Sequence, residues 1–371
     1  MPRKTASSAK ADIFAPRLKR LRNSLPEHKI DSLLVTNPAD IRYLTGFRGE
    51  DAYLLVALKG KARLISDSRF ETELRSLKKR LSIIIRTGPM IPAVVNLADK
   101  ISLTCMGVQA EYLTVSVRSQ LQRKLGAKRL RNTEGLIRNL RVIKDEAELK
   151  LLRKAGQIQQ KALDLTLKTV KAGQTETEVA ARLAYEMRNL GADGEAFPSI
   201  VAARANGALP HAVPGRTRLA AGQPLLIDWG ASYQGYRSDM TRTFTLGRWS
   251  AKMREIYGIV VESQLAGIAA VQPGARCADV DKASREVIEA AGYGKLFGHG
   301  LGHGIGLDVH EAPGLNRRSN EVLQPGMVVT IEPGIYIPGT GGVRIEDDVL
   351  VTDRDHKVLT NYPKDIESMV I

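Results

Sequence analysis

Acidic side chains in the second half of the chain stand in two pairs, each symmetrical about a turn. In PLLIDWGASYQGYRSDMTRTFTLG, Asp228 and Asp239 lie at equal distances from Tyr233-Gln234, with apolar-rich runs on both sides. A turn centred there predicts a β-hairpin with both carboxylates on one face, where cross-strand Cβ atoms are about 4.5–5.5 Å apart. Two ionised carboxylates at that separation repel strongly unless a cation lies between them.

The second pair lies in MVVTIEPGIYIPGTGGVRIEDDVLVT, where Glu332 and Glu346 are symmetrical about Gly339. Strand-like runs again flank the turn, so a second hairpin is expected to bring two more carboxylates together. A single acid at a strand end commonly caps a turn, but two pairs embedded in apolar strands indicate a site. Asp347 and Asp348, which follow Glu346, are predicted to lie at the surface or behind the ligands.

Histidines cluster in the same half of the chain. Four of the six lie in Gly- and Pro-rich segments: His211, His299, His303 and His310. In FGHGLGHGIGLDVHEAP a glycine occupies every second position from 298 to 306. In an extended chain, His299, Leu301, His303 and Ile305 would share one face, and the other face would be bare backbone open to close approach. A lone histidine is more often an ordinary polar residue, but this number and setting favour a site; His28 and His356 are interpreted as surface residues.

One imidazole combined with four carboxylates is a ligand set typical of a two-metal site, with ions about 3.5–4 Å apart. Its oxygen-rich character favours Mn²⁺, Co²⁺, Fe²⁺ or Zn²⁺ over copper. The only cysteines, Cys105 and Cys277, exclude a thiolate zinc site. The sequence has no G-x-x-x-x-G-K-[ST] loop, no H-E-x-x-H pair and no G-x-S-x-G elbow, so a serine or cysteine nucleophile is not expected.

The elements that must position these residues begin near Arg141–Lys144. Asp145 can cap a helix there, and Glu148 completes an acidic variant of the capping box. That helix has an apolar stripe and should end before Gly173. Further helices are predicted at about 176–190, 251–271 and 278–291. Because each helix pair precedes paired strands, the second half of the chain is expected to consist of two similar halves.

Before that boundary, strands alternate with helices, as in an α/β domain. IDSLLVTN is predicted to be a strand that ends in a turn at Asn37-Pro38, and DAYLLVALKG, KARLISDS, LSIIIRTG and CMGVQAE are predicted to be further strands. Helices are expected over 13–29, within RFETELRSLKKR and near 115–125. The predicted organisation is a disordered tail over 1–12, one domain over 13–143 and a second over 144–371.

Composition limits the class of protein. The chain has 371 residues, of which 43% are hydrophobic and 26% charged, and a net charge of +15. The first 150 residues hold 30 basic and 15 acidic residues, against 25 of each afterwards, so the excess charge is confined to the first part. With few aromatics interleaved, a solvated basic face is favoured over a partner's docking surface, and nucleic acid is not expected as a partner. No apolar run approaches the roughly 20 residues of a membrane span, and no secretory signal is evident, so a cytoplasmic setting is expected.

These motifs resemble those of the pita-bread metallopeptidases, which include methionine aminopeptidase, Xaa-Pro aminopeptidase and Xaa-Pro dipeptidase (prolidase). The resemblance rests on IDWGASYQGYRSDMTRT, HGLGHGIGLDVHE, TIEPGIY and GVRIEDDVLV, and it extends from about Leu140 to the end of the chain. IDSLLVTNPADIRYLTGF looks like the creatinase-type N-domain of the proline-directed members. The resemblance therefore implies an α/β N-terminal domain followed by an α+β pita-bread catalytic domain.

The resemblance also implies roles for individual residues. The metal ligands would be Asp228, Asp239, His303, Glu332 and Glu346. His211 and His310 match histidines that contact the substrate near the metals, and Glu332 is a plausible proton acceptor. His299, Tyr336 and Arg344 match residues that line the pocket or support the ligands in the proline-specific branch. The cofactors would be two divalent ions, with Mn²⁺ favoured and Co²⁺ or Zn²⁺ as alternatives.

The expected activity is hydrolysis of the Xaa-Pro bond in proline-containing peptides, by a homodimer. Release of the residue before proline from longer peptides, as by an Xaa-Pro aminopeptidase, is slightly favoured. The alternative is an Xaa-Pro dipeptidase, which acts on dipeptides only and shares these residues. A remote alternative is a non-catalytic, peptide-binding member of the same fold, against which the intact ligand set argues.

Overall fold

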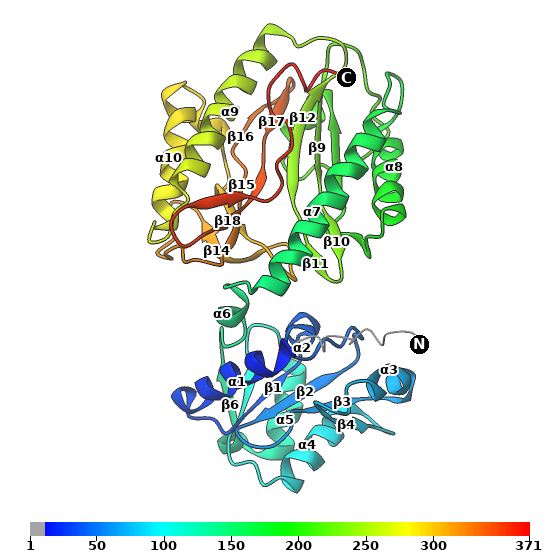
Figure 1. Ribbon diagram of the computed structural model, residues 1–371, viewed down its shortest axis with the longest axis vertical. Helices are drawn as coiled ribbons and strands as arrows, with labels where there is room; N and C mark the ends of the chain where they lie inside the picture. Colours follow the sequence, from blue (N-terminus) through cyan, green and yellow to red (C-terminus); the bar gives the residue numbers. More distant parts are fainter. Residues whose placement is uncertain (1–11) are drawn as a thin grey trace, which may run out of the picture. The chain divides into compact units, whose positions relative to one another are not determined.

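The computed structural model describes residues 12–371, so the predicted tail lies outside the described residues except for Asp12. The chain divides into two compact units after Arg141, two residues before the division predicted from the sequence. Each unit has its own sheet and helices (Figure 1). Within the described residues, no helix is both long enough and apolar enough to cross a membrane.

The first unit is built on a six-stranded sheet with the strand order β4-β3-β2-β1-β5-β6. The strands are β1 (Ser32–Val35), β2 (Tyr53–Ala57), β3 (Arg63–Ser66), β4 (Ser82–Ile85), β5 (Met106–Gln109) and β6 (Leu130–Thr133). The helices are α1 (Phe14–Ser24), α2 (Pro38–Thr45), α3 (Glu71–Arg75), α4 (Met90–Lys100), α5 (Val115–Leu125) and α6 (Arg138–Arg141). The sheet is mixed, because β1 pairs parallel with β5 but antiparallel with β2.

Two local expectations for this unit were wrong. Asn37-Pro38 is not a turn that ends a strand but the start of α2, where the Asn37 side chain accepts from the Ala39 N–H at 2.9 Å. Proline suits the first helical position because its missing N–H would have no partner there anyway. The helix expected within RFETELRSLKKR is α-helical only over Glu71–Arg75. The helix α4 was not predicted, although it packs Val94 and Leu97 onto the sheet.

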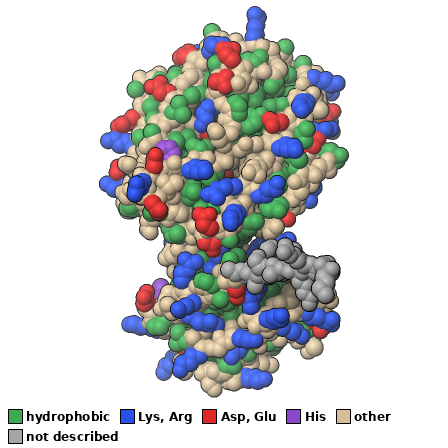
Figure 2. Space-filling view, in the orientation of Figure 1, with side chains coloured by type: hydrophobic (Ala, Val, Ile, Leu, Met, Phe, Trp, Pro, Cys, Tyr) green, Lys and Arg blue, Asp and Glu red, His purple; other side chains and the backbone are tan. Residues whose placement is uncertain are grey.

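Charge distinguishes the surface of this unit. Figure 2 shows many more Lys and Arg side chains than acidic ones on its visible face. Some cations are paired, as in the cluster of Arg69 and Arg86 with Asp51 and Asp67. Others, such as Arg22, donate to backbone carbonyls instead. The excess of basic residues found in the sequence of this unit therefore lies largely on its surface.

The second unit contains four long helices: α7 (Glu146–Leu167), α8 (Glu176–Asn189), α9 (Ala251–Ala270) and α10 (Cys277–Ala290). The predicted capping box of Asp145 and Glu148 is present at the start of α7, and Thr175 and Glu178 form a second one at α8. Each box satisfies N–H groups that the first helical turn leaves without partners. All four helices match their predicted positions to within one or two residues at most ends.

The strands of this unit form several antiparallel sheets. They are β7 (Gly194–Glu195), β8 (Ile200–Ala203), β9 (Pro224–Trp229), β10 (Ala231–Tyr233), β11 (Tyr236–Arg237), β12 (Met240–Thr245), β13 (Gly302–Gly304), β14 (Glu311–Leu315), β15 (Val328–Ile331), β16 (Gly334–Ile337), β17 (Gly341–Arg344), β18 (Asp347–Val351) and β19 (His356–Val358). The orders are β12-β9-β8, β11-β10-β7, β14-β13-β15-β18-β19 and β16-β17. As predicted, each helix pair is followed by paired strands, and the two helix pairs flank the strands (Figure 1).

The core of the second unit lies between these strands and the helices. Trp229 from β9, Tyr257 from α9 and Ile331 from β15 are at most 1% exposed and belong to one continuous apolar cluster. The acidic residues lie at or next to the ends of these close-packed strands, so the packing of the strands fixes the positions of the carboxylates.

Candidate metal centre

The first hairpin differs from its predicted register. Asp228 pairs with Thr241 rather than with Asp239, and Tyr233 pairs with Tyr236. The turn is therefore centred on Gln234-Gly235, one residue later than expected, and both of these residues have positive φ, 47° and 80°. A two-residue hairpin turn of that kind favours glycine and matches the twist of the strands. Asp239 consequently lies just before β12, between that strand and β11.

The second hairpin has the predicted symmetry. Tyr336 pairs with Gly342 and Ile331 with Asp347, so the register of both strand pairs is centred on Gly339. Glu332 and Glu346 lie at equivalent positions in the short unpaired segments between these two ladders. Because neither glutamate belongs to a paired strand, its side chain need not follow the alternation of side chains between the two faces of a sheet. Both side chains can therefore reach the cavity.

The glycine run permits close approach of other strands, as predicted. A Cβ at Gly302 would lie 2.0 Å from the carbonyl oxygen of Thr330, and one at Gly304 would lie 2.0 Å from that of Ala312. The expectation that four side chains share one face was wrong, because only Gly302–Gly304 is a strand. Leu301 and Ile305 are fully buried, whereas His299 and His303 line the cavity.

Nearly all the predicted site residues converge on one cavity of about 270 Å³. Its lining includes nine of the ten: His211, Asp228, Asp239, His299, His303, His310, Glu332, Arg344 and Glu346. Tyr336 lies behind them, with its hydroxyl hydrogen-bonded to His299 and Arg344. Ligand atoms of Asp239, His303 and Glu346 lie within 4.8 Å of one another, a spacing that one cation can span.

The electrostatics of the cavity suit a cation. Burial, then the neighbouring carboxylates of Glu346 and Asp228, raise the pKa of Asp239 well above its usual value. Burial raises the pKa of Glu332 to about 8, and burial with the charge of Glu332 raises that of Glu346 strongly. Asp228 Oδ1 and Asp239 Oδ1 are buried and have no hydrogen-bond partner among the described residues. Metal ions stabilise buried carboxylate oxygens that have no hydrogen-bond donor, so the residues of this cavity fit divalent cations.

The orientation of His303 leaves one ring nitrogen for a metal. Its Nδ1–H donates to the carbonyl oxygen of Gly304 at 3.0 Å, since a carbonyl can only accept. The lone pair of Nε2 therefore faces Glu332 Oε1 at 3.5 Å and Asp239 Oδ2 at 3.8 Å. Burial lowers the pKa of His303 to about 4, which keeps the ring neutral and able to bind a metal.

Arg344 connects two candidate ligands to the cavity wall through hydrogen bonds. Its Nη2 donates to Asp228 Oδ2 at 2.6 Å, and its Nη1 donates to the Tyr336 hydroxyl at 2.9 Å. The Tyr336 hydroxyl donates in turn to His299 Nε2 at 2.9 Å, because His299 Nδ1–H is used by the Gly300 carbonyl. Arg344 Nε also donates to Thr241 Oγ1, whose hydroxyl donates to Glu346 Oε2 at 2.6 Å. One guanidinium thus orients two carboxylates.

The mouth of the cavity carries the remaining histidines and an apolar rim. His211 and His310 are both exposed, and the ring of His310 packs edge-on against that of His303 at 4.4 Å. Phe197, Ile200 and Pro210 add apolar surface to the lining of the cavity. A substrate can therefore meet imidazole donors and apolar surface at the same entrance.

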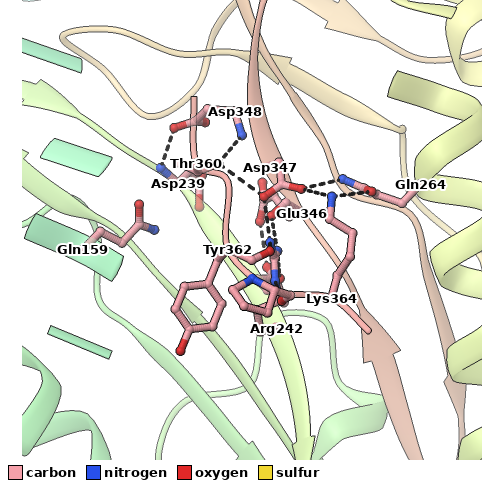
Figure 3. A network of polar contacts seen from close by, with 12 residues as sticks. Gln159, Asp239, Arg242, Gln264, Glu346, Asp347, Asp348, Thr360, Tyr362 and Lys364 are labelled. Atoms are coloured by element: carbon pink, nitrogen blue, oxygen red, sulfur yellow. Dashed lines mark hydrogen bonds and ion pairs between the residues drawn. The ribbon is translucent and has the colours of Figure 1, made fainter. Parts of the chain in front are cut away.

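A second group of polar residues lies behind the ligands (Figure 3). Arg242 is fully buried, and its Nη1 donates to the carbonyl oxygen of Glu346 at 2.6 Å. Its Nη2 donates to Asp347 Oδ1 at 2.8 Å and to the Tyr362 carbonyl at 2.8 Å. These contacts fix the backbone that carries Glu346 against the C-terminal segment.

Sequence reasoning missed several of these residues. Thr241 and Arg242 gave no signal beyond their place in SDMTRTFT, and Thr360 lies far from every motif. Asp347 and Asp348 are not at the surface: they are 0% and 3% exposed, and the alternative position behind the ligands fits Asp348. His356, interpreted as a surface residue, is half-buried and hydrogen-bonds the Val271 carbonyl, whereas His28 is exposed as expected.

Comparisons with known proteins agree with this geometry. Residues 150–353 match the model of Metallopeptidase family M24, and residues 17–143 match the Creatinase/Prolidase N-terminal domain. The chain is 34% identical over 356 residues to an Xaa-Pro dipeptidase of Pyrococcus horikoshii, covering 96% of this chain and 99% of that protein.

Solved structures give the same picture. An Xaa-Pro dipeptidase from Bacillus anthracis is similar with a TM-score of 0.92 and 39% identity, covering 96% of this chain and 99% of that one. An X-Pro aminopeptidase from Thermotoga maritima is similar with a TM-score of 0.86 and 32% identity, covering 92% of this chain and 98% of that one.

Proposed function

Because the chain belongs to metallopeptidase family M24 and carries a creatinase/prolidase N-terminal domain, we propose that it hydrolyses the Xaa-Pro bond with two divalent cations. The proposed ligands are Asp228, Asp239, His303, Glu332 and Glu346. The observation that carries the proposal is the convergence of Asp239, His303 and Glu346 within 4.8 Å at a cavity that further carboxylates, those of Asp228 and Glu332, also line. Family membership makes the chain a peptidase and leaves the non-catalytic alternative without support.

The scissile bond is a tertiary amide, which lacks an N–H and presents a proline ring. When bound, the cations supply Lewis acidity and lower the pKa of a coordinated water. Glu332 accepts the proton of the attacking water and passes it to the departing proline nitrogen. His211 and His310, at the mouth, donate hydrogen bonds to the substrate carbonyl as negative charge develops on it. Arg344 holds Asp228 in place, and His299 and Tyr336 shape the wall.

Dipeptides are the proposed preferred substrates. The named relatives include Xaa-Pro dipeptidases at 34% and 39% identity. The aminopeptidase activity that the sequence slightly favoured is therefore the second candidate, and the similar X-Pro aminopeptidase supports it. We further propose Mn²⁺ as the cation and a homodimer as the assembly, which light scattering of the purified protein would check.

The test compares Ala-Pro with Ala-Pro-Ala-Ala, using metal-stripped protein re-supplied with Mn²⁺, Co²⁺ or Zn²⁺. Proline release from Ala-Pro alone supports the dipeptidase, and alanine release from the longer peptide supports the aminopeptidase. Ala-Ala serves as the substrate without proline and should remain intact. Cleavage of neither proline peptide with any of the metals would contradict the proposal.

A matched pair of variants tests the ligand assignment. Asp239→Asn keeps the shape of the side chain but removes the charge that holds a cation, so activity should fall by at least a thousandfold while the chain still folds. Asp353→Asn removes an exposed acid of the same type and should retain full activity. Full activity in the Asp239 variant would contradict its assignment as a ligand.

A further inference from the structure

Two consecutive aspartates follow the ligand Glu346 in β18, and their surroundings differ. Asp347 is 0% exposed and Asp348 is 3% exposed. Neighbouring residues of a strand point to opposite faces of the sheet, so the two carboxylates meet different partners. Asp347 points toward Arg242 and Lys364, and Asp348 reaches Asp239 (Figure 3).

Both oxygens of Asp347 are satisfied by donors. Oδ1 accepts from Arg242 Nη2 at 2.8 Å, and Oδ2 accepts from Gln264 Nε2 at 2.9 Å and from Lys364 Nζ. Two cations therefore neutralise one buried carboxylate. A carboxylate held in this way is part of the packing of the unit, and removing its charge takes the anionic partner away from buried Arg242 and from the partly exposed Lys364.

Asp348 has the opposite character. Its Oδ2 accepts from the backbone N–H of Asp239 at 3.1 Å, and its own N–H donates to Thr360 Oγ1 at 2.8 Å. Its Oδ1 is buried and has no hydrogen-bond partner among the described residues. Asp348 therefore meets the candidate ligand Asp239 through a single hydrogen-bond acceptor, and Thr360 fixes the backbone from which that acceptor projects.

We propose that Asp348 is a positioning residue for the metal centre: its carboxyl oxygen accepts from the backbone N–H of Asp239 and so fixes where that ligand's carboxylate lies, whereas Asp347 serves stability. The inference rests on the metal centre put forward in the proposed function. Asp348 acts through Asp239 and Thr360 anchors it, so the C-terminal segment takes part in the site. Outer partners of metal ligands commonly change metal affinity by about 10–100-fold.

The same substitution at the two neighbouring positions separates these roles. Asp348→Asn keeps an oxygen that can accept from the Asp239 N–H, and Asp348→Ala removes that acceptor. Asp347→Asn removes the charge that Arg242 and Lys364 share. For each variant and the parent, Mn²⁺ affinity of the metal-stripped protein is measured by calorimetry, and unfolding of the metal-free protein by circular dichroism. Asp353→Asn, an exposed acid beyond the end of the same strand, is the control.

Asp348→Ala should weaken Mn²⁺ binding about tenfold or more and lower the metal-free unfolding temperature by about 3–6 °C, the shift expected when one buried N–H loses its partner at a cost of roughly 1–2 kcal/mol. Asp347→Asn should lower that temperature on the order of 10 °C, with Mn²⁺ affinity of the folded protein within about threefold of the parent. Asp348→Asn, which keeps the acceptor, should bind Mn²⁺ within about threefold of the parent.

Unchanged Mn²⁺ affinity in Asp348→Ala would overturn the inference, as would an equal loss of affinity in Asp348→Asn or in Asp347→Asn. These outcomes are distinct from failure of the proposed function. If the parent binds Mn²⁺ and Asp348→Ala binds it less tightly, but the parent cleaves no Xaa-Pro peptide, the inference stands and the peptidase assignment falls.

Discussion

Arg344 links Asp228 to the Tyr336–His299 wall and, through Thr241, to Glu346. Such a residue contributes through geometry as well as charge, because a guanidinium presents several donors in a fixed plane. Lysine has one compact ammonium group and cannot make these contacts simultaneously. The contacts of Arg344 therefore yield a prediction that distinguishes orientation from charge.

We expect Arg344→Lys to retain a positive charge yet lower kcat/KM by about 10–100-fold, because Asp228 and Tyr336 lose their common donor. Steady-state kinetics on Ala-Pro with saturating Mn²⁺ would measure the effect. Arg354→Lys, at an exposed position, is the matched control and should leave kcat/KM unchanged. Parent-like activity in Arg344→Lys would show that charge alone suffices.

The buried acids also predict a dependence on pH. Burial raises the pKa of Glu332 to about 8 in the metal-free protein, and burial with the neighbouring carboxylates also raises the pKa values of Asp239 and Glu346. Glu332 is therefore largely protonated at pH 7, so binding of a cation must release its proton, and affinity should rise with pH up to about 8. Calorimetry of Mn²⁺ binding in two buffers of different ionisation enthalpy gives the number of protons released. Zero release at pH 7 would contradict the raised pKa values.

The same raised pKa values determine whether the free energy of unfolding of the metal-free protein rises or falls with pH. A carboxyl whose pKa is higher in the folded than in the unfolded chain binds more protons when folded, so its contribution falls as pH rises. The loss begins near the ordinary carboxyl pKa of about 4 and continues through about 8 for Glu332. Metal-free protein should therefore lose more free energy of unfolding than loaded protein between pH 5.5 and 8.5. Urea titrations at both pH values test this, and parallel pH dependence of the two forms would contradict it.

At the level of elements, the glycine run shows how backbone space controls the site. Gly302→Ala places a Cβ 2.0 Å from the Thr330 carbonyl oxygen, whereas a Cβ at Gly298 meets nothing within 4 Å. We expect Gly302→Ala to lower the free energy of unfolding by about 1–3 kcal/mol or more, since β13 must move away from β15. Gly298→Ala should be neutral. Thermal unfolding of both variants measures this, and equal effects would contradict the role given to close strand packing.

The two hairpins show how far sequence patterns reach at this scale. The symmetry about Gly339 correctly gave the second register, because apolar runs of equal length flank that turn. The first register was wrong by one residue at the turn, since only local backbone geometry reveals that Gln234-Gly235 rather than Tyr233-Gln234 turns the chain. The carboxylates and histidines that converge on the cavity were predicted from their types and spacing, and Arg344 was predicted from the family resemblance. The residues behind them, such as Thr360 and Arg242, were not, because tertiary packing alone brings them close.

For the whole molecule, the division after Arg141 leaves every candidate site residue in the second unit. The largest apolar cluster of that unit is also formed by its own residues, from Val142 to Met369. We therefore expect the fragment 142–371 to fold cooperatively and to bind Mn²⁺ within about threefold of the intact chain, as measured by circular dichroism and calorimetry. An unfolded fragment would show that the first unit is needed for stability.

The crowding of acids around the cavity also bears on how long a copy of the protein survives. Without its cations, the folded chain keeps the carboxyl groups of Asp239, Glu332 and Glu346 buried and close together, which disfavours their ionised forms. Local openings there are correspondingly more frequent, and proteases cut a chain in proportion to the population that opens. Cation binding suppresses those openings by mass action. The supply of the metal therefore governs the abundance of the protein as well as its turnover of substrate.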